Sequence, residues 1–116
     1  MPRVIKALSV RQPWARLIAA GIKTLEVRSR HTHYRGELLI CSSLSAPAHA
    51  QGPRGMALAT VRLVNCRPFT PADVGAACVN YAPDLFVWKL TDAHPLPRPF
   101  PVKGSLNFFE VFLPAT

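Results

Sequence analysis

The chain has 116 residues, which suits one domain with a modest core and leaves no room for two. Its 14 Lys and Arg residues outnumber 6 Asp and Glu, for a formal charge of +8. This excess favours polyanionic partners, nucleic acid first, although a generally basic protein would share it. No apolar run has the length of a transmembrane helix and no signal peptide precedes the first strand, so we expect a cytoplasmic protein with no membrane partner.

The first part of the chain predicts a strand, a short helix and a second strand. Apolar residues alternate over Val4–Val10, as they do in a half-buried strand. Pro13 suits the start of a helix, apolar residues recur at helical spacing from Trp14, and Gly21 suits a left-handed cap. The helix is therefore short, at about two turns. Alternation resumes over Thr24–Arg28 and predicts the next strand.

Polar residues gather where these three elements meet. They precede the helix, follow it, and then recur at every second residue, a period that puts the last four on one strand face. Cations predominate and there is a single carboxylate, so the cluster either pairs internally, awaits an anion or is simply a solvated face. The residues concerned are Arg11, Gln12, Lys23, Thr24, Glu26, Arg28 and Arg30.

The middle of the chain continues as strands and one more helix. Leu38–Cys41 is too apolar to be exposed on both sides, so we expect this strand to cross the core. Ser42–Gly55 has the composition of a loop or a loosely helical connection, and Met56–Val64 that of another strand. Thr70 has the features of a helix start, in which Asp73 serves as a capping acid.

Two aromatic strands are predicted near the end of the chain, Leu85–Leu90 and Phe108–Leu113, and we expect them to be neighbours. Prolines alternate between them over Pro95–Pro101, a pattern that predicts a rigid, polyproline-like crossover. The three cysteines are widely spaced and expected to be reduced core residues. His31 and His33 share a strand face without a third ligand in view, so we expect no metal and no cofactor.

Five or six short strands with two short helices and no repeated βαβ unit define the expected fold class. They predict an α+β, mostly β fold over residues 1–116 as a single domain. The expected architecture is a small, mostly antiparallel barrel with the two helices at its ends.

The first motif resembles that of the ASCH domain family, which joins a Gln-Pro-Trp helix start to Gly-x-Lys-x-x-Glu-x-Arg. Leu8–Ser29, LSVRQPWARLIAAGIKTLEVRS, carries the resemblance, and Tyr34–Ile40, Gly55–Val61 and Pro101–Gly104 support it. The resemblance implies a PUA-like barrel in which a cleft borders the first helix and its following strand. It also implies the lining of that cleft, namely Arg11, Gln12, Lys23, Thr24, Glu26, Arg28, Lys103 and Ser105.

Three functions remain open for such a cleft. The first is binding of nucleic acid, with RNA favoured over DNA, or of a single-stranded or modified nucleotide, with a base near Lys23 and Glu26. The second, implied by the resemblance, is a ribonuclease or an amidohydrolase acting on acetylated cytidine. Its catalytic set would be Lys23, Thr24 and Glu26, although adjacent strand residues point to opposite faces. The third is a protein-interaction domain with a basic face. The residues expected to contact nucleic acid are Arg11, Gln12, Lys23, Glu26, Arg28, Arg30, Lys103 and Ser105.

Overall fold

The computed structural model describes residues 3–114 and contains six strands, two α-helices and one 3-10 turn. Among these residues no helix is long and apolar enough to cross a membrane. The predicted elements are present, and two of the strands extend well beyond their apolar segments. In chain order the elements are β1 (Arg3–Val10), α1 (Trp14–Ala19), β2 (Leu25–Arg28), β3 (Gly36–Ser42), β4 (Met56–Pro68), η1 (Pro71–Asp73), α2 (Val74–Ala77), β5 (Phe86–Pro101) and β6 (Phe108–Leu113).

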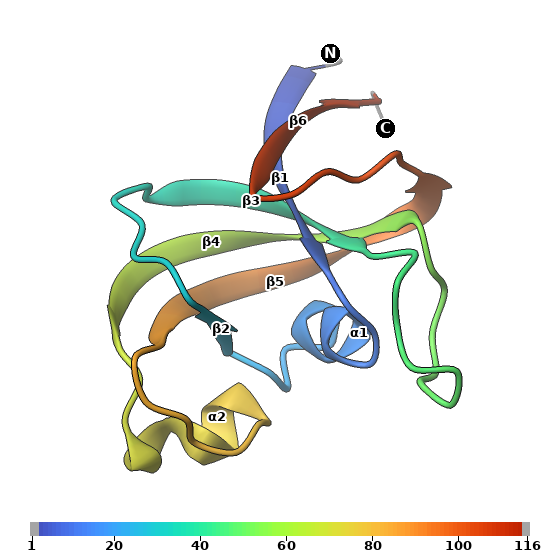
Figure 1. Ribbon diagram of the computed structural model, residues 1–116. Coiled ribbons are helices and arrows are strands. Elements are labelled where there is room, and N and C mark those ends of the chain that lie inside the picture. The colour runs from blue at the N-terminus through green and yellow to red at the C-terminus, as the bar shows by residue number, and fades with distance from the viewer. Residues whose placement is uncertain (1–2, 115–116) are drawn as a thin grey trace.

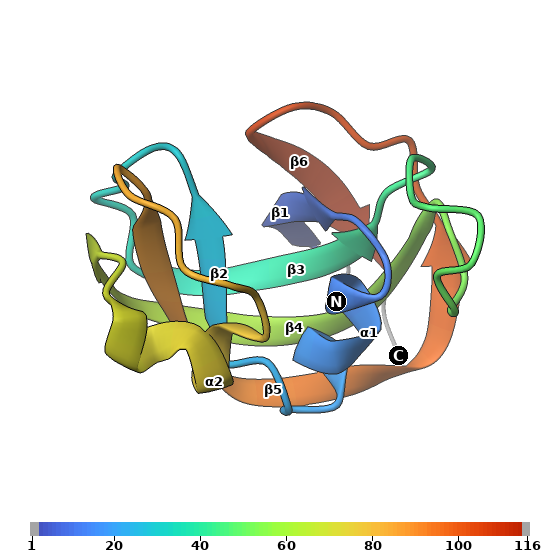
Figure 2. The same ribbon diagram turned by 60° about the horizontal axis from the view of Figure 1, so that its bottom comes forward.

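The strands form one six-stranded sheet in the order β2-β5-β4-β3-β1-β6. β1 and β3 are parallel, and every other neighbouring pair is antiparallel. Both helices lie below β3, β4 and β5 in the view of Figure 1. β2 and β6 are the edges of the sheet, so the expectation of a closed barrel is wrong: the sheet curls strongly, but its two ends do not pair (Figures 1 and 2). The fold is α+β and mostly β, with an open sheet.

The curled sheet brings β2 opposite the end of β1, where a side chain spans the space between them. β6 begins at Phe108, opposite Leu8, so within the described residues Ser9 and Val10 have no strand beside them on that edge. The Arg28 guanidinium of β2 donates instead to the Ser9 carbonyl oxygen at 2.9 Å. A side chain thus occupies a backbone acceptor that a strand ladder would use. We call this unpaired space between β2 and the β1–β6 pair the seam.

β5 is a single strand over Phe86–Pro101 and is longer than its aromatic segment. It pairs with β4, and three register shifts bend the pair. The proline-rich part is therefore a strand, and the expectation of a polyproline-like crossover there is wrong. Alternation of the prolines leaves the N–H groups of Leu96, Arg98 and Phe100 on one edge, and β2 does not extend along this part of β5. β5 lies between β2 and β4 while β6 lies beside β1, so the two aromatic strands are not neighbours as expected.

β3 is buried on both faces, as its composition predicts. Leu38, Leu39, Ile40 and Cys41 are each 0% exposed. Leu38 and Ile40 belong to a core that includes residues of α1, whereas Leu39 and Cys41 belong to a second core that residues of β5 and β6 cover. Full burial of a leucine side chain stabilises a fold by about 1.5–3 kcal/mol. The centre of the sheet is thus a fixed support for the loops at its ends.

α1 ends in the manner that Gly21 predicts. Gly21 has φ +76°, and its N–H donates to the Ile18 carbonyl at 3.0 Å. The Ile22 N–H donates to the Leu17 carbonyl at 2.9 Å, which completes a Schellman motif. The Lys23 N–H also donates to the Leu17 carbonyl, at 3.1 Å. The glycine cap therefore sets where the chain turns from the helix to Lys23 and β2.

Thr70 and Asp73 form the cap that the sequence predicts for the second helical segment. The Asp73 carboxylate accepts hydrogen bonds from the Thr70 N–H at 2.9 Å and from the Thr70 hydroxyl at 3.0 Å. Its ion pair with Arg67, at 2.7 Å, and the bonds from Thr70 hold the pKa of Asp73 well below its usual range. The helix α2 that follows ends at Ala77, before Cys78 turns the chain with φ +59°.

Candidate functional site

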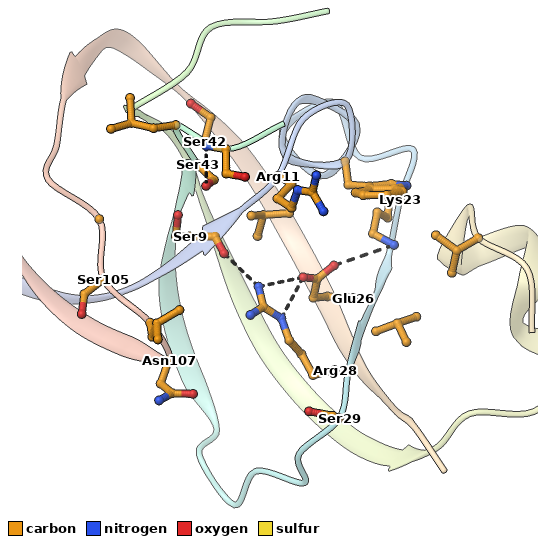
Figure 3. Close-up of a pocket in the computed structure, with 18 of the residues that line it drawn as sticks. Ser9, Arg11, Lys23, Glu26, Arg28, Ser29, Ser42, Ser43, Ser105 and Asn107 are labelled. Carbon is orange, nitrogen blue, oxygen red and sulfur yellow. Dashed lines mark hydrogen bonds and ion pairs between the residues drawn. The ribbon is translucent and has the colours of Figure 1, made fainter. Parts of the chain in front are cut away.

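A cavity of about 900 Å³ opens along the seam. β2 forms one wall, and the segment before β6 forms the opposite wall, where Figure 3 shows Ser105 and Asn107. The end of β1, Trp14 of α1, Lys23, the segment 42–45 and the segment after α2 also contribute to the lining. Small-ligand sites in proteins typically occupy roughly 300–1,000 Å³, so this volume suits a ligand the size of a nucleotide.

The floor of the cavity is a chain of charges centred on Glu26. Its carboxylate accepts a hydrogen bond from Arg28 Nε at 2.9 Å and lies 3.8 Å from the Lys23 ammonium. Arg28 Nη2 lies 2.9 Å from the same carboxylate and donates to the Ser9 carbonyl. Figure 3 shows Glu26 between the two cations. The polar cluster of the first motif therefore pairs internally, with one carboxylate between two cations.

Lys23 is the most buried of these groups, since only 2% of the residue is exposed. Its ammonium also donates to the Ala77 carbonyl at the end of α2, one of the carbonyls that a helix leaves without a backbone partner. Burial lowers the pKa of Lys23 from its usual value, against the opposing effect of Glu26. A lysine of lowered pKa can exchange a proton with a ligand more readily than a surface lysine.

The lowered pKa of Lys23 makes part of the folding stability pH dependent. Above the lowered pKa, the folded protein has released a proton that the unfolded chain still binds until the pH passes the usual value of 10.5. In that window Lys23 contributes a component of the free energy of unfolding that rises with pH. We expect Lys23→Met to abolish this rise, and urea unfolding of both proteins from neutral pH to 10.5 measures the difference.

Two comparisons isolate the contribution of Lys23. Lys89 is exposed on β5, and Lys89→Met is expected to leave the pH profile unchanged. Burial raises the pKa of Cys41 from 9.0 to about 12, which lowers stability as the pH rises through that range, so the informative quantity is the difference between variant and wild type. Identical profiles for Lys23→Met and the wild type would mean that the ammonium is not desolvated in the folded protein.

Arg11 supplies a cation at the end of β1, where it is exposed and lines the cavity. Among residues 3–114 no carboxylate pairs with it. Arg11, Lys23 and Arg28 are the cations of the described lining, and Glu26 is its one carboxylate. The lining thus has a net positive charge, which favours an anionic group on the ligand.

Gln12 lies beside the cavity and not in its lining. The residue is 0% exposed, and its amide is bonded at both ends. Nε2 donates to the Pro53 carbonyl at 2.8 Å, and Oε1 accepts from the Arg16 N–H at 3.0 Å. One bond holds the loop after β3, and the other satisfies a free N–H in the first turn of α1. The backbone therefore engages both ends of the amide that we expected to line the cleft and to contact nucleic acid.

The remaining predicted site residues lie in different places. Ser105 lines the cavity, whereas Thr24 and Lys103 do not, and Arg30 lines a smaller cavity next to it. Thr24 is in the turn before β2, and its carbonyl accepts from the Leu90 N–H at 2.9 Å. The structure brings together Arg11, Lys23, Glu26, Arg28 and Ser105 from the predicted set.

Several lining residues have no clear signal in the sequence. They are short hydroxyl or amide side chains and two leucines that are 77% and 87% exposed. Serine and asparagine are common in loops for reasons of turn geometry, so their presence alone indicates no ligand. The one sequence signal is the pair Ser42 and Ser43 at the end of the buried strand β3, because functional residues often lie where a strand ends in a loop. The full set of these lining residues is Ser9, Ser42, Ser43, Leu44, Leu106 and Asn107.

Trp14 lines the cavity and also packs against the core that includes α1. The two tyrosines lie elsewhere, because Tyr34 packs against Phe108 and Tyr81 packs against Phe69. Among the described lining residues Trp14 is therefore the aromatic ring that a planar ligand can contact.

The cysteines and histidines lie outside this cavity. Cys41 and Cys66 are buried free thiols in β3 and β4, as predicted, whereas Cys78 is only half-buried after α2, so the expectation of a core residue is wrong there. His31 and His33 are exposed on the loop after β2, with ring centroids 4.7 Å apart. Within residues 3–114 no group of three His, Cys, Asp or Glu side chains is placed to hold a metal ion.

The fold and the first motif together identify a family. The ASCH domain model matches residues 8–97, a range that contains the α1 motif and the charge cluster on the cavity floor. The chain belongs to the ASCH domain family.

Similarity to a human protein and to solved structures agrees with this family assignment. The chain is 37% identical over 128 residues to human activating signal cointegrator 1, an alignment that covers 90% of this chain and 22% of that protein, so the chain spans about a fifth of its length. Among solved structures, ASCH from Zymomonas mobilis has a TM-score of 0.66 at 16% identity, over 83% of this chain and 72% of that chain. A mutant of the same protein gives 0.63 at 14%, over 94% and 87%. The likeness to these structures concerns the fold alone.

Proposed function

We propose that this domain binds RNA, or another single-stranded or modified nucleotide, in the cavity on the seam. The observation that carries the proposal is a positively charged lining with one carboxylate held at its floor. Arg11 and Arg28 suit phosphate groups, because a guanidinium offers paired donors to phosphate oxygens. Glu26 suits the exocyclic amine or ring N–H of a base, which a carboxylate can accept. The cavity thus matches a ligand that carries an anionic group and a planar group with donors.

Hydroxyl and amide groups around the cavity support a ribonucleotide in particular. Ser9, Ser105 and Asn107 lie on the side of the cavity away from β2, where a sugar between base and phosphate can reach them (Figure 3). Such groups can donate to or accept from a ribose 2′-hydroxyl, which DNA lacks. Trp14 adds a ring for contact with a base. RNA is therefore favoured over DNA in this proposal.

Arg11→Ala tests the proposal without disturbing the buried charges. We expect labelled single-stranded RNA of random sequence to bind the wild type with an affinity that falls steeply as salt rises, because phosphate contacts release counterions. The variant is expected to bind about tenfold more weakly and to reduce the slope of log K against log salt by about 1. Fluorescence anisotropy across a salt series measures both quantities.

Arg98→Ala is the matched control for Arg11→Ala. Arg98 is exposed on β5 and contributes to neither cavity, yet its loss changes the net charge by the same amount. It is expected to leave the affinity nearly unchanged. Equal weakening by the two variants would mean that binding depends on net charge alone and that the cavity is not the site.

Ribonuclease activity is a second candidate function, favoured by a buried ammonium of lowered pKa that lies 3.8 Å from a carboxylate. Lys23 and Glu26 can exchange a proton with a ribose hydroxyl, and Arg28 can stabilise the charge of a phosphorane. An amidohydrolase mechanism with Thr24 as nucleophile has less support, because Thr24 does not line the cavity.

The Lys23→Met variant distinguishes a nucleic-acid-binding module from an enzyme. Binding and product formation are measured in the same samples of labelled RNA. Loss of turnover by about two orders of magnitude or more, with Arg98→Ala fully active, would establish catalysis through Lys23. Salt-dependent binding without product in the wild type would instead identify a binding module.

A further inference from the structure

A second, smaller cavity of about 260 Å³ adjoins the first. Arg28, Ser29 and Asn107 line both cavities, so the two follow one another along the seam. The second cavity has the loop after β2 on one side, and β5 with the beginning of β6 on the other. The seam is therefore a groove with two compartments: the first is the cavity of about 900 Å³, and the second is the cavity of about 260 Å³.

The second compartment has aromatic and cationic walls. Trp88 and Phe108 line its inner side, with ring centroids 5.5 Å apart, whereas Arg30 and His31 are exposed at its outer side. Trp88 Nε1 donates to the Arg30 carbonyl at 3.0 Å, which fixes the loop backbone beside the compartment. The His31 ring meets the Phe86 ring edge-on, with centroids 5.5 Å apart. Bases stack on imidazole rings and on guanidinium planes, so the outer wall suits a base.

Arg28 stands between the two compartments. Its Nε and Nη2 are held by Glu26 and by the Ser9 carbonyl, and its guanidinium carbon lies 5.9 Å from the centre of the Trp88 ring. Among the described residues no hydrogen-bond acceptor engages Nη1, which is left for a ligand. A positive charge fixed between two compartments lies where the phosphate joining two nucleotides would pass.

We propose that the seam binds two consecutive nucleotides of a single strand. One base occupies the first compartment, the connecting phosphate contacts Arg28, and the next base stacks against His31 and Arg30. This inference rests on the proposed function and specifies its ligand. The preferred ligand is an oligonucleotide strand, which binds more tightly than a free nucleoside or mononucleotide.

Ribodinucleoside monophosphates and nucleoside 3′-monophosphates test this inference. Both carry one phosphate on the 3′ oxygen of the first nucleoside, but only the dinucleotides carry a second base. Calorimetric titration with equimolar pools of each set measures the two affinities. We expect the dinucleotides to bind about tenfold more tightly, in line with the stacking of one base. His31→Ala is expected to remove most of this gain and to leave the affinity for the 3′-monophosphates unchanged.

His33→Ala is the matched control, because His33 is exposed beside His31 and lines neither compartment. It is expected to keep the full gain. One contrary result is equal affinity for the two ligand sets, and another is tighter binding of the dinucleotides that persists in both His31→Ala and Arg30→Ala. Either result would contradict a base-binding site in the second compartment and leave the proposed function unaffected. If neither set binds and longer single-stranded RNA does not bind either, the proposed function fails together with this inference.

Discussion

Replacement of Glu26 by alanine is expected to lower the free energy of unfolding by about 3–5 kcal/mol, the usual cost of removing one partner from a buried ion pair. The loss is large because Lys23, only 2% exposed, keeps the Ala77 carbonyl as its partner and loses the carboxylate with which it pairs. Arg28 loses the same carboxylate while its side chain is 28% exposed. Urea unfolding at neutral pH measures the effect.

Glu37→Ala is the matched control for a surface carboxylate. Glu37 pairs with Arg3 at 2.6 Å, but the two side chains are 37% and 49% exposed, so we expect a loss below about 1 kcal/mol. Lys23→Met added to Glu26→Ala should recover part of the larger loss, because it removes the buried charge that has no partner. Equal losses from Glu26→Ala and Glu37→Ala, or no recovery in the double variant, would contradict this account of the cavity floor.

Gln12→Ala is expected to lower the free energy of unfolding by about 2–3 kcal/mol, since it removes a helix cap and a buried hydrogen bond together. The variant frees the Arg16 N–H in α1 and the Pro53 carbonyl in the loop over residues 43–55. That loop carries part of the cavity wall, so cleavage within it by a protease under native conditions should also become faster. Chemical unfolding and limited proteolysis measure the two effects.

Two further variants test the role of the Gln12 amide. Gln51 is exposed in the same loop, and Gln51→Ala is expected to change neither stability nor cleavage. Gly52→Ala should loosen the loop from the opposite side, because the new Cβ would lie 2.6 Å from Gln12 Nε2 at a φ of +113°. A loop that is cleaved at the wild-type rate in both Gln12→Ala and Gly52→Ala would show that other contacts hold it.

The elements that the sequence predicts well are those with local causes. Gly21 ends α1 through two backbone bonds within six residues of chain, and Thr70 with Asp73 caps the second helical segment in the same local way. The open edge of the sheet has no such local cause. It depends on β6 beginning only opposite Leu8, and on Arg28 reaching the Ser9 carbonyl, a partner 19 residues away along the chain. The prediction for the proline-rich segment is wrong for a similar reason, because the pairing of that segment depends on the length of β4.

The charge cluster of the site is visible in the sequence, but the directions of its side chains are not. The period of two along β2 places Glu26 and Arg28 on one face, and the cavity contains both. Lys23 joins them from the turn before the strand, a position that depends on how α1 ends. The Gln12 amide nitrogen finds the Pro53 carbonyl because the loop over residues 43–55 folds back to it. No pattern within the motif itself indicates that contact.

Within the described residues no backbone hydrogen bonds join the strands across the seam, and this affects what sets the width of the cavity. A closed barrel would have to break paired backbone bonds in order to admit a thicker ligand. Here Arg28 joins the walls through the Ser9 carbonyl, and Trp88 meets Phe108 across the same space at 5.5 Å. A guanidinium can exchange a carbonyl for a phosphate oxygen without losing a hydrogen bond. The width of the opening therefore depends on side-chain contacts and not on backbone pairing, so substitutions at those contacts can change the width without breaking backbone hydrogen bonds between strands.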